Sequence, residues 1–295
     1  MSLNCRQPPV SIRLELLPGD RLPDQLQAAH QFGFDGIALP GRFLDQWLRP
    51  LRECHADSPL PFAGISLGFN GSLLNPQEAG RRACRESLLR LLDLAAELDA
   101  GWINVPPCLI QDNPARITDA GGFASLDERL DALLLDQLPA LGDAAHERGV
   151  QFLLEPVNRY ESNFLNSLGH AARLCQQLNH PAIGCTADFF HMQLEELNTA
   201  NALRAAGGVT IRSPGEATDP AGRPAGRPAL RHVHVAENTR VEPGPGSLDF
   251  RPGFCALKEV GYTGWIEIEC RRLSGRPEEV LPRSADYLRR SWHEA

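Results

Sequence analysis

Lysine is almost missing from this chain of 295 residues: Lys258 is the only one, so arginine carries nearly all of the positive charge. Acidic residues outnumber basic ones, and the formal net charge is −8 at pH 7. Nucleic-acid phosphates are bound by clustered lysine and arginine. The charge balance therefore argues against a nucleic-acid partner.

Other common signatures are missing as well. None of the eight cysteines has Cys-x-x-Cys spacing, so they are expected to be reduced core thiols. No apolar run approaches the roughly eighteen residues of a membrane span, and the first residues lack a signal-peptide core. A cytoplasmic protein without a membrane partner is expected. No glycine-rich phosphate loop follows an early strand, which disfavours a doubly wound nucleotide-binding fold.

Short apolar runs alternate with helical patterns from end to end, with no linker that separates two cores. Eight strand–helix pairs in a chain of this length predict a single (β/α)8 TIM barrel over residues 1–295, for which about 250 residues is typical. A helix over 194–206 is expected between the sixth and seventh strands. The predicted strands are Ile12–Leu17, Gly36–Leu39, Phe62–Leu67, Trp102–Val105, Phe152–Glu155, Ile183–Asp188, Leu230–Ala236 and Trp265–Cys270.

One segment breaks this rhythm. Residues 207–228 are rich in glycine and proline, which predicts irregular structure. The segment lies between a helix and the next strand, so it is expected on the amino-terminal face of the barrel. We expect it to be an oligomer contact or a mobile loop, and not a lid over an active site.

Four side chains stand at the ends of the last four buried strands: Glu155, Asp188, His234 and Glu269. They are 33, 46 and 35 residues apart, about one strand–helix unit each. Chemistry in such barrels takes place at the carboxyl ends of the strands. Each residue alone has an ordinary explanation, such as a pairing with arginine or a buried hydrogen bond. Together they would converge on one point.

Three carboxylates and one imidazole form a harder ligand set than a structural zinc site, which prefers Cys and His. The set favours one divalent ion, Mn²⁺ or Mg²⁺, with Co²⁺ or Zn²⁺ possible. Positions left open would take water or substrate, as in a catalytic site. Further polar residues follow the same strands and could grip a polar ligand, although Asn158, Arg159 and Glu237 are better explained as loop polarity or as support for the ligands.

The segments around these residues resemble a known superfamily. They are Leu154-Glu-Pro-Val-Asn-Arg-Tyr-Glu161, Asp188-Phe-Phe-His-Met-Gln-Leu-Glu-Glu196, His232-Val-His-Val-Ala-Glu-Asn-Thr-Arg240 and Gly264-Trp-Ile-Glu-Ile-Glu269. They are similar to the xylose-isomerase-like sugar phosphate isomerases and epimerases, nearest to the D-tagatose 3-epimerase group. The likeness covers most of the chain and is strongest over 150–270.

The resemblance implies that Glu155, Asp188, His234 and Glu269 bind one divalent metal. It also implies that three residues contact the substrate (Glu161, His191 and Arg240) and that Glu155 and Glu269 lie on opposite faces of the reacting carbon. Two departures from the family are visible. Asp188-Phe-Phe-His191 replaces the usual Asp-Thr-Phe-His, which affects the pocket shape, and the 207–228 insert leaves the oligomer geometry open.

The chemistry of the residues agrees with a sugar epimerase or isomerase. Stabilising an enediolate acidifies the C–H beside a carbonyl, so that one catalytic glutamate, Glu155 or Glu269, can remove the proton and the other return one. A dehydratase or decarboxylase of the same superfamily uses the same logic and stays open. Free sugar and sugar phosphate also stay open, as does a homo-oligomer. A DNA-repair endonuclease is disfavoured, because its extra histidines after the third and fourth strands are missing.

Overall fold

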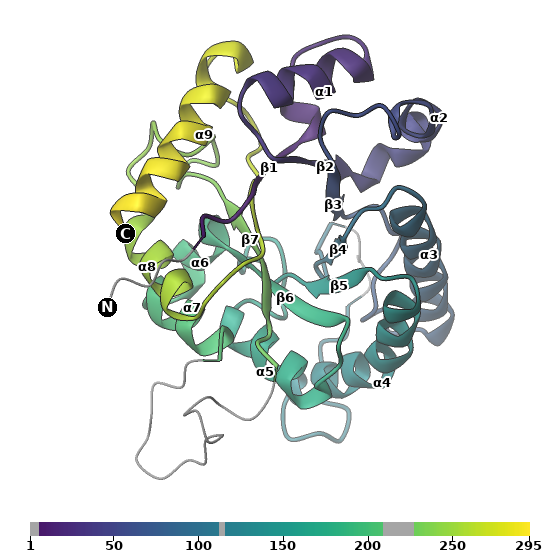
Figure 1. Cartoon of the computed structure of the whole chain (residues 1–295). Coiled ribbons are helices and arrows are strands. Elements are labelled where there is room, and N and C mark those ends of the chain that lie inside the picture. The colour runs from purple at the N-terminus through teal and green to yellow at the C-terminus, as the bar shows by residue number, and fades with distance from the viewer. Residues whose placement is uncertain (1–5, 112–115, 209–226) are drawn as a thin grey trace.

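A closed barrel of eight parallel strands forms the centre of the protein, in the computed structural model that describes residues 6–111, 116–208 and 227–295 (Figure 1). Each strand pairs with the next along the chain, and β8 pairs with β1. The predicted (β/α)8 barrel is therefore confirmed. The strands are β1 Val10–Arg13, β2 Gly36–Pro40, β3 Phe62–Ser66, β4 Trp102–Val105, β5 Gln151–Leu154, β6 Ile183–Asp188, β7 Leu230–Val235 and β8 Trp265–Ile268.

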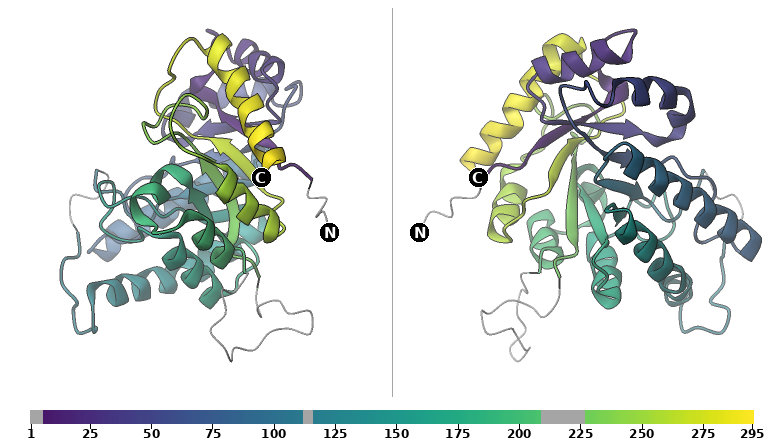
Figure 2. Two further views of the ribbon diagram at one scale, coloured as in Figure 1. Left: turned by 90° about the vertical axis from the view of Figure 1, so that its left-hand side faces the viewer. Right: turned by 45° about the vertical axis from the view of Figure 1, so that its right-hand side comes forward.

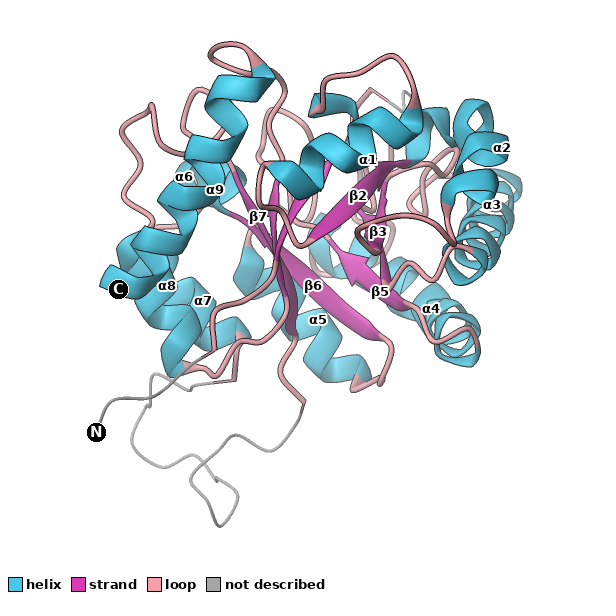
Figure 3. Ribbon diagram, turned by 45° about the horizontal axis from the view of Figure 1, so that its top comes forward, coloured by secondary structure: helices cyan, strands magenta, loops and turns pink. Residues whose placement is uncertain are grey.

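Helices surround the barrel on the outside, as Figures 2 and 3 show from other directions. Their buried apolar faces join the outer faces of the strands in one large core. The last helix closes the ring beside the first, where Arg289 pairs with Asp35 at 3.0 Å. The helices are α1 Leu22–Gln31, α2 Leu44–Cys54, α3 Glu78–Glu97, α4 Leu126–Glu147, α5 Leu168–Leu178, α6 Phe189–Glu195, α7 Thr199–Ala206, α8 Arg251–Glu259 and α9 Pro277–Glu294.

Two of the predicted elements were wrong in detail. The first strand ends at Arg13, and the apolar Leu14–Leu16 that seemed to continue it forms a 3-10 helix instead. The single helix expected over 194–206 is two helices, α6 and α7, because α6 begins directly after β6 at Phe189. Both corrections matter, since they place Arg13 at the barrel mouth and His191 on a helix.

The side chains inside the barrel change from apolar to polar along its axis. Near the amino ends of the strands, Trp102, Leu153 and Ala38 form a small apolar cluster with Trp265 beside it. Alternate residues of a strand face the same side, so the residues two positions after Trp102, Leu153 and Trp265 also face the interior. They are the buried polar or charged Asn104, Glu155 and Glu267. Gly64 of β3 leaves room for the Trp102 side chain of β4, because a Cβ at this position would lie 2.0 Å from the Trp102 ring.

The extent of the domain and the 207–228 insert stay predictions. The described residues form one barrel, which is compatible with a single domain over 1–295. Residues 209–226 of the insert lie outside the described part of the chain. Among the described residues, no helix combines the length and the apolar character needed to cross a lipid bilayer.

Candidate metal centre

The barrel fold brings the four predicted ligand residues together at one end. Glu155 directly follows β5, Asp188 ends β6, His234 lies in β7 and Glu269 directly follows β8. Each offers one oxygen or nitrogen atom, and these four atoms all lie within 4.8 Å of one another. All four residues are buried. The predicted convergence at the carboxyl ends of the strands is thus present, although their role as ligands is not yet established.

His234 lies at the centre of the group. Its Nδ1 is 2.9 Å from Oε1 of Glu155 and 3.2 Å from Oε2 of Glu269. Two buried carboxylate oxygens, Oδ2 of Asp188 and Oε2 of Glu269, have no hydrogen-bond partner among the described residues. Imidazole and guanidinium nitrogens lie 3.2 to 4.0 Å from these two oxygens without hydrogen-bonding to them. A cation at this point would supply the coordination that the buried oxygens lack. The donor set and these two oxygens therefore fit a divalent metal ion.

Burial and mutual repulsion shift the titration of the group. Burial raises the pKa of Glu155, and the neighbouring Glu269 raises it further. Burial likewise raises the pKa of Asp188 to about 6. Burial also opposes the charged form of His234, but Glu269 and Glu155 raise its pKa well above the usual value. In the metal-free protein the imidazolium thus supplies positive charge between the carboxylates.

Glu269 behaves in the opposite way to Glu155. Burial would raise its pKa, but His234 and then Arg13 hold the pKa of this carboxyl well below its usual range. Arg13 ends β1, and its Nη1 donates to Oε1 of Glu269 at 2.6 Å. In the metal-free protein the pKa values of these two carboxyl groups are therefore shifted in opposite directions.

Asp188 has two structural tasks. Its Oδ1 accepts a hydrogen bond from the backbone N–H of Phe190 at 2.7 Å and so caps the N-terminus of α6. Its Oδ2 faces the other way, 3.4 Å from Nε2 of His191. The cap fixes the start of α6, and this helix carries His191 into the site.

The three predicted substrate-binding residues lie next to the acidic group. Nη1 of Arg240 donates to Oε1 of Glu161 at 2.7 Å, and its Nη2 lies 3.4 Å from Nε2 of His191. The same guanidinium lies 4.5 Å from the centre of the Phe190 ring. Burial lowers the pKa of His191, which favours the neutral imidazole. The arrangement offers both donors and acceptors for a polar molecule.

These residues line a cavity of about 120 Å³. Glu155, Glu269, Glu161, His191 and Arg240 all contribute to its wall, together with Arg13 and Arg271. A larger cavity of about 650 Å³ lies at the other end of the barrel, around Arg6, Asp35 and Trp265. The groups that could hold a metal or move a proton line the smaller cavity. We therefore take the smaller cavity as the candidate functional site.

Comparison with known proteins identifies the family of the chain. Residues 26–291 match the family described as Xylose isomerase-like TIM barrel. The chain belongs to this family. It is 27% identical over 270 residues to the 3-dehydro-D-guloside 4-epimerase of Escherichia coli (strain K12), covering 92% of this chain and 95% of the relative. It is 29% identical over 253 residues to a ketose 3-epimerase of Arthrobacter globiformis, covering 83% of this chain and 75% of that protein.

Solved structures show the same fold. A 3-keto-D-glucoside 4-epimerase from E. coli superposes with a TM-score of 0.77 at 24% identity and covers 96% of this chain and 100% of its own. A D-psicose 3-epimerase from Clostridium cellulolyticum H10, solved with D-tagatose, gives a TM-score of 0.77 at 18% identity, with 96% and 99% covered. The predicted family and the predicted enzyme class, that of isomerases and epimerases, are confirmed.

In this member of the family, sequence reasoning missed the polar residues that support the central group. Asn104 donates to Oε2 of Glu155 at 2.6 Å and accepts from the Thr186 hydroxyl at 2.6 Å. Arg13 holds Glu269, and Glu267 lies beside His234. The two-residue period of the strands could have indicated Glu267, since it shares a face with Glu269 in Trp265-Ile-Glu-Ile-Glu269. Nothing local in the sequence links Arg13 or Asn104 to strands that lie so far along the chain.

Two other polar residues that follow the strands, Arg159 and Glu237, stabilise loops. The Arg159 side chain pairs with Glu195 at 2.8 Å, which ties the loop after β5 to the end of α6. Glu237 is buried and accepts from the backbone N–H groups of Gly244 and Leu248. Asn158 belongs to the site's surroundings, because its backbone N–H donates to Nδ1 of His191 at 3.1 Å.

Proposed function

We propose that this protein is a divalent-metal-dependent epimerase that inverts a carbon beside the carbonyl of a sugar. The observation that carries the proposal is the buried set of Glu155, Asp188, His234 and Glu269, whose ligand atoms lie within 4.8 Å of one another. The sugar epimerases among its relatives support it, since they match most of the chain at 27% and 29% identity.

The same four residues would hold the metal. Their three carboxylates and one imidazole favour Mn²⁺ or Mg²⁺, and Co²⁺ or Zn²⁺ also suit such a set. When bound, such an ion acts as a Lewis acid that stabilises the negative charge left when a proton departs from a carbon beside a carbonyl.

Glu155 and Glu269 would move the protons. Each has one oxygen held by a neighbour, Asn104 in the first case and Arg13 in the second. The other oxygens, Oε1 of Glu155 and Oε2 of Glu269, lie 2.9 and 3.2 Å from His234 Nδ1. One carboxylate removes the proton from carbon, and the other returns a proton to the same carbon from the opposite face. Return to the neighbouring carbon would give an isomerisation instead.

Glu161, His191 and Arg240 would bind and orient the sugar. Because Nδ1 of a neutral His191 accepts from Asn158, its Nε2–H can donate to a hydroxyl oxygen, and Arg240 can donate to a carbonyl or hydroxyl oxygen. Arg240 is itself oriented by Glu161, which also pairs with Arg271 at 2.9 Å. Because Arg240 and Arg271 share this carboxylate and Arg13 pairs with Glu269, the cavity suits an uncharged sugar better than a sugar phosphate. A cytoplasmic location and a homo-oligomer stay predictions.

Substitution of each glutamate tests the scheme. Glu269→Gln and Glu155→Gln should each lower turnover by about 10²- to 10⁴-fold, the usual contribution of a general acid or base. Turnover would be measured on a panel of ketoses and 3-keto-glycosides with Mn²⁺ or Mg²⁺ supplied, and products identified by NMR. Glu259→Gln, which changes an exposed glutamate that pairs with Arg204, is the matched control and should leave the rate unchanged. A near-native rate for Glu269→Gln would rule out the two-carboxylate scheme.

A further inference from the structure

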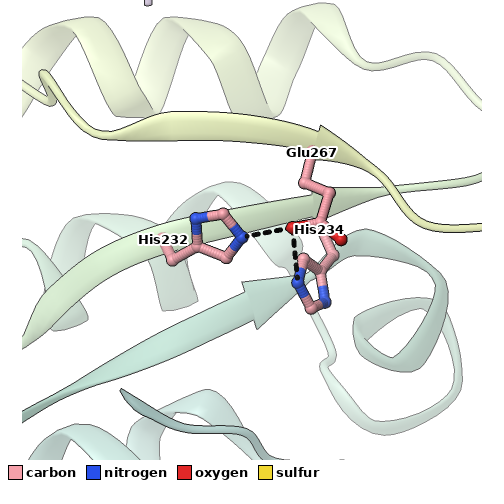
Figure 4. Close-up of side chains that lie close together, drawn as sticks. All are labelled: His232, His234 and Glu267. Atoms are coloured by element: carbon pink, nitrogen blue, oxygen red, sulfur yellow. Dashed lines mark hydrogen bonds and ion pairs between the residues drawn. The ribbon is translucent and has the colours of Figure 1, made fainter. Parts of the chain in front are cut away.

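A second buried cluster lies directly beneath the proposed metal centre. It consists of His232, His234 and Glu267, and all three residues have 0% of their surface exposed (Figure 4). Oε2 of Glu267 lies 3.1 Å from Nε2 of His232 and 3.6 Å from Nε2 of His234. His234 thus belongs to both groups, with one ring nitrogen toward each.

We infer that Glu267 is a positioning residue, which holds the Nε2 side of His234 so that Nδ1 faces the metal centre. The inference rests on the proposed function, because it concerns a ligand of the proposed metal. The two nitrogens of a neutral imidazole differ: one carries a proton and the other a lone pair. Nε2 of His234 has no hydrogen-bond partner among the described residues, and the Glu267 carboxylate 3.6 Å away is an ion-pair contact that favours the proton on Nε2 and leaves the lone pair on Nδ1. Metal-bound histidines commonly have such a partner on the second nitrogen.

The strand register fixes this arrangement. His234 of β7 and Glu267 of β8 are direct partners in the parallel pairing, so their side chains stand beside each other inside the barrel. On the far edge of the ring, Nδ1 lies 2.9 Å from Glu155 and 3.2 Å from Glu269. A ring turned over would exchange the places of Nδ1 and Cδ2, so that Nδ1 would lose both of these contacts.

His232 holds Glu267 in turn. Its Nε2–H donates to the same Oε2 atom, and its ring packs on Trp102, with 4.2 Å between the ring centres. Trp102 belongs to the apolar cluster at the amino-terminal side of the interior. The position of His234 is therefore tied, through Glu267 and His232, to a rigid part of the barrel.

A second metal ion at this cluster is the competing explanation, since three of its ligand atoms also lie within 4.8 Å of one another. Such an ion and the first one would both need His234, one through each nitrogen, and a neutral imidazole has only one lone pair for this purpose. The cluster is also fully buried, which leaves no open position for water. A positioning role accounts for the same contacts without these costs.

The test measures metal affinity, which does not depend on turnover. Chelator-stripped protein would be titrated with Mn²⁺ by calorimetry, and the free ion followed by electron paramagnetic resonance. Glu267→Met removes the carboxylate at similar length and should weaken Mn²⁺ binding about 10- to 100-fold, the usual effect of losing such a partner. Glu267→Gln keeps an oxygen acceptor and should weaken binding less. The absorption spectrum of bound Co²⁺ should change in Glu267→Met and stay close to wild type in Glu267→Gln.

Two controls separate positioning from folding. Glu242→Gln changes another buried glutamate, which accepts hydrogen bonds from Ser274, and should leave Mn²⁺ affinity unchanged. Denaturant unfolding of metal-free Glu267→Met should show some loss of stability, because the variant leaves buried His232 without its partner. A cooperative unfolding transition that lies well above the titration conditions would show that the variant is folded when its Mn²⁺ affinity is measured.

The outcomes are distinct. If Glu267→Met and wild type bind Mn²⁺ with equal affinity, the positioning role of Glu267 is wrong but the proposed metal centre stands. The same holds if wild type binds two ions per chain and Glu267→Met binds one. Failure of the wild-type protein to bind any divalent ion contradicts the proposed metal centre itself and the inference with it. One ion per wild-type chain, with the graded loss of affinity described above, supports both.

Discussion

At the scale of single residues, three of the four central side chains each have a polar neighbour from another strand. Arg13 of β1 holds Glu269, Asn104 of β4 holds Glu155, and Glu267 of β8 lies beside His234. These neighbours leave one atom of each central side chain directed at a common point. Preorganisation of this kind lets a site bind an ion or a transition state without first rearranging.

Replacing Arg13 should show how much its ion pair with Glu269 contributes to the unfolding free energy. Arg13→Met should lower the unfolding free energy of the metal-free protein by about 3 kcal/mol, because breaking a largely buried pair leaves an uncompensated charge. The double variant Arg13→Met, Glu269→Gln should recover part of that loss. Urea unfolding of four proteins in the presence of a chelator (wild type, Arg13→Met, Glu269→Gln and the double variant) would give the coupling between the two sites.

The matched control is Arg204→Met, which breaks a more exposed arginine–glutamate pair and should cost no more than about 1 kcal/mol. If the loss in Arg13→Met equals that in Arg204→Met, the buried pair contributes nothing special, and the explanation for the low pKa of Glu269 is wrong.

At the scale of elements, α6 connects the metal centre to the substrate side of the cavity. Asp188 ends β6, caps α6 through Oδ1 and directs Oδ2 into the site, and α6 then presents His191. A helix of seven residues has little stability of its own, so its first turn depends on this cap. Binding of the metal and placement of His191 therefore share one residue.

Asp188→Asn and Asp188→Ala should separate the two tasks. Asparagine caps a helix about as well as aspartate, so metal-free Asp188→Asn should be more stable than Asp188→Ala by about 1 kcal/mol. Both variants lose the charged ligand oxygen and should bind Mn²⁺ much more weakly than wild type. Denaturant unfolding in a chelator and Mn²⁺ titration provide the two readings. Equal stability of the two variants would show that the cap does not support α6.

The sequence predicted this region only in part. The four central residues could be identified because each ends an apolar run, which is a local signal. The start of α6 was missed, since Phe189 and Phe190 continue the apolar pattern of β6 and the helix was expected only from Leu194. Leu14–Leu16 were likewise predicted to continue the first strand, but they form a 3-10 helix after β1. Local hydrophobicity does not tell where a strand stops when the next element is also apolar.

At the scale of the whole molecule, closure of the barrel brings these distant segments together. Arg13 and Glu269 are 256 positions apart along the chain, and the pairing of β8 with β1 makes them neighbours. The eight strand–helix repeats predicted the closed fold, because their number and order are regular. The partners across the interior, such as Asn104 with Thr186, depend on strand register and could not be predicted from local pattern.

The central claim is that this site moves a proton to and from a sugar carbon with the help of a metal. The most direct measurement is proton exchange in D₂O, followed by NMR on ketoses and 3-keto-glycosides, with metal-loaded and chelator-treated protein. The account predicts deuterium at the carbon beside the carbonyl in the epimerised product, and no exchange after chelation. Epimer formed without deuterium, or exchange that continues at full rate in the chelator, would contradict it.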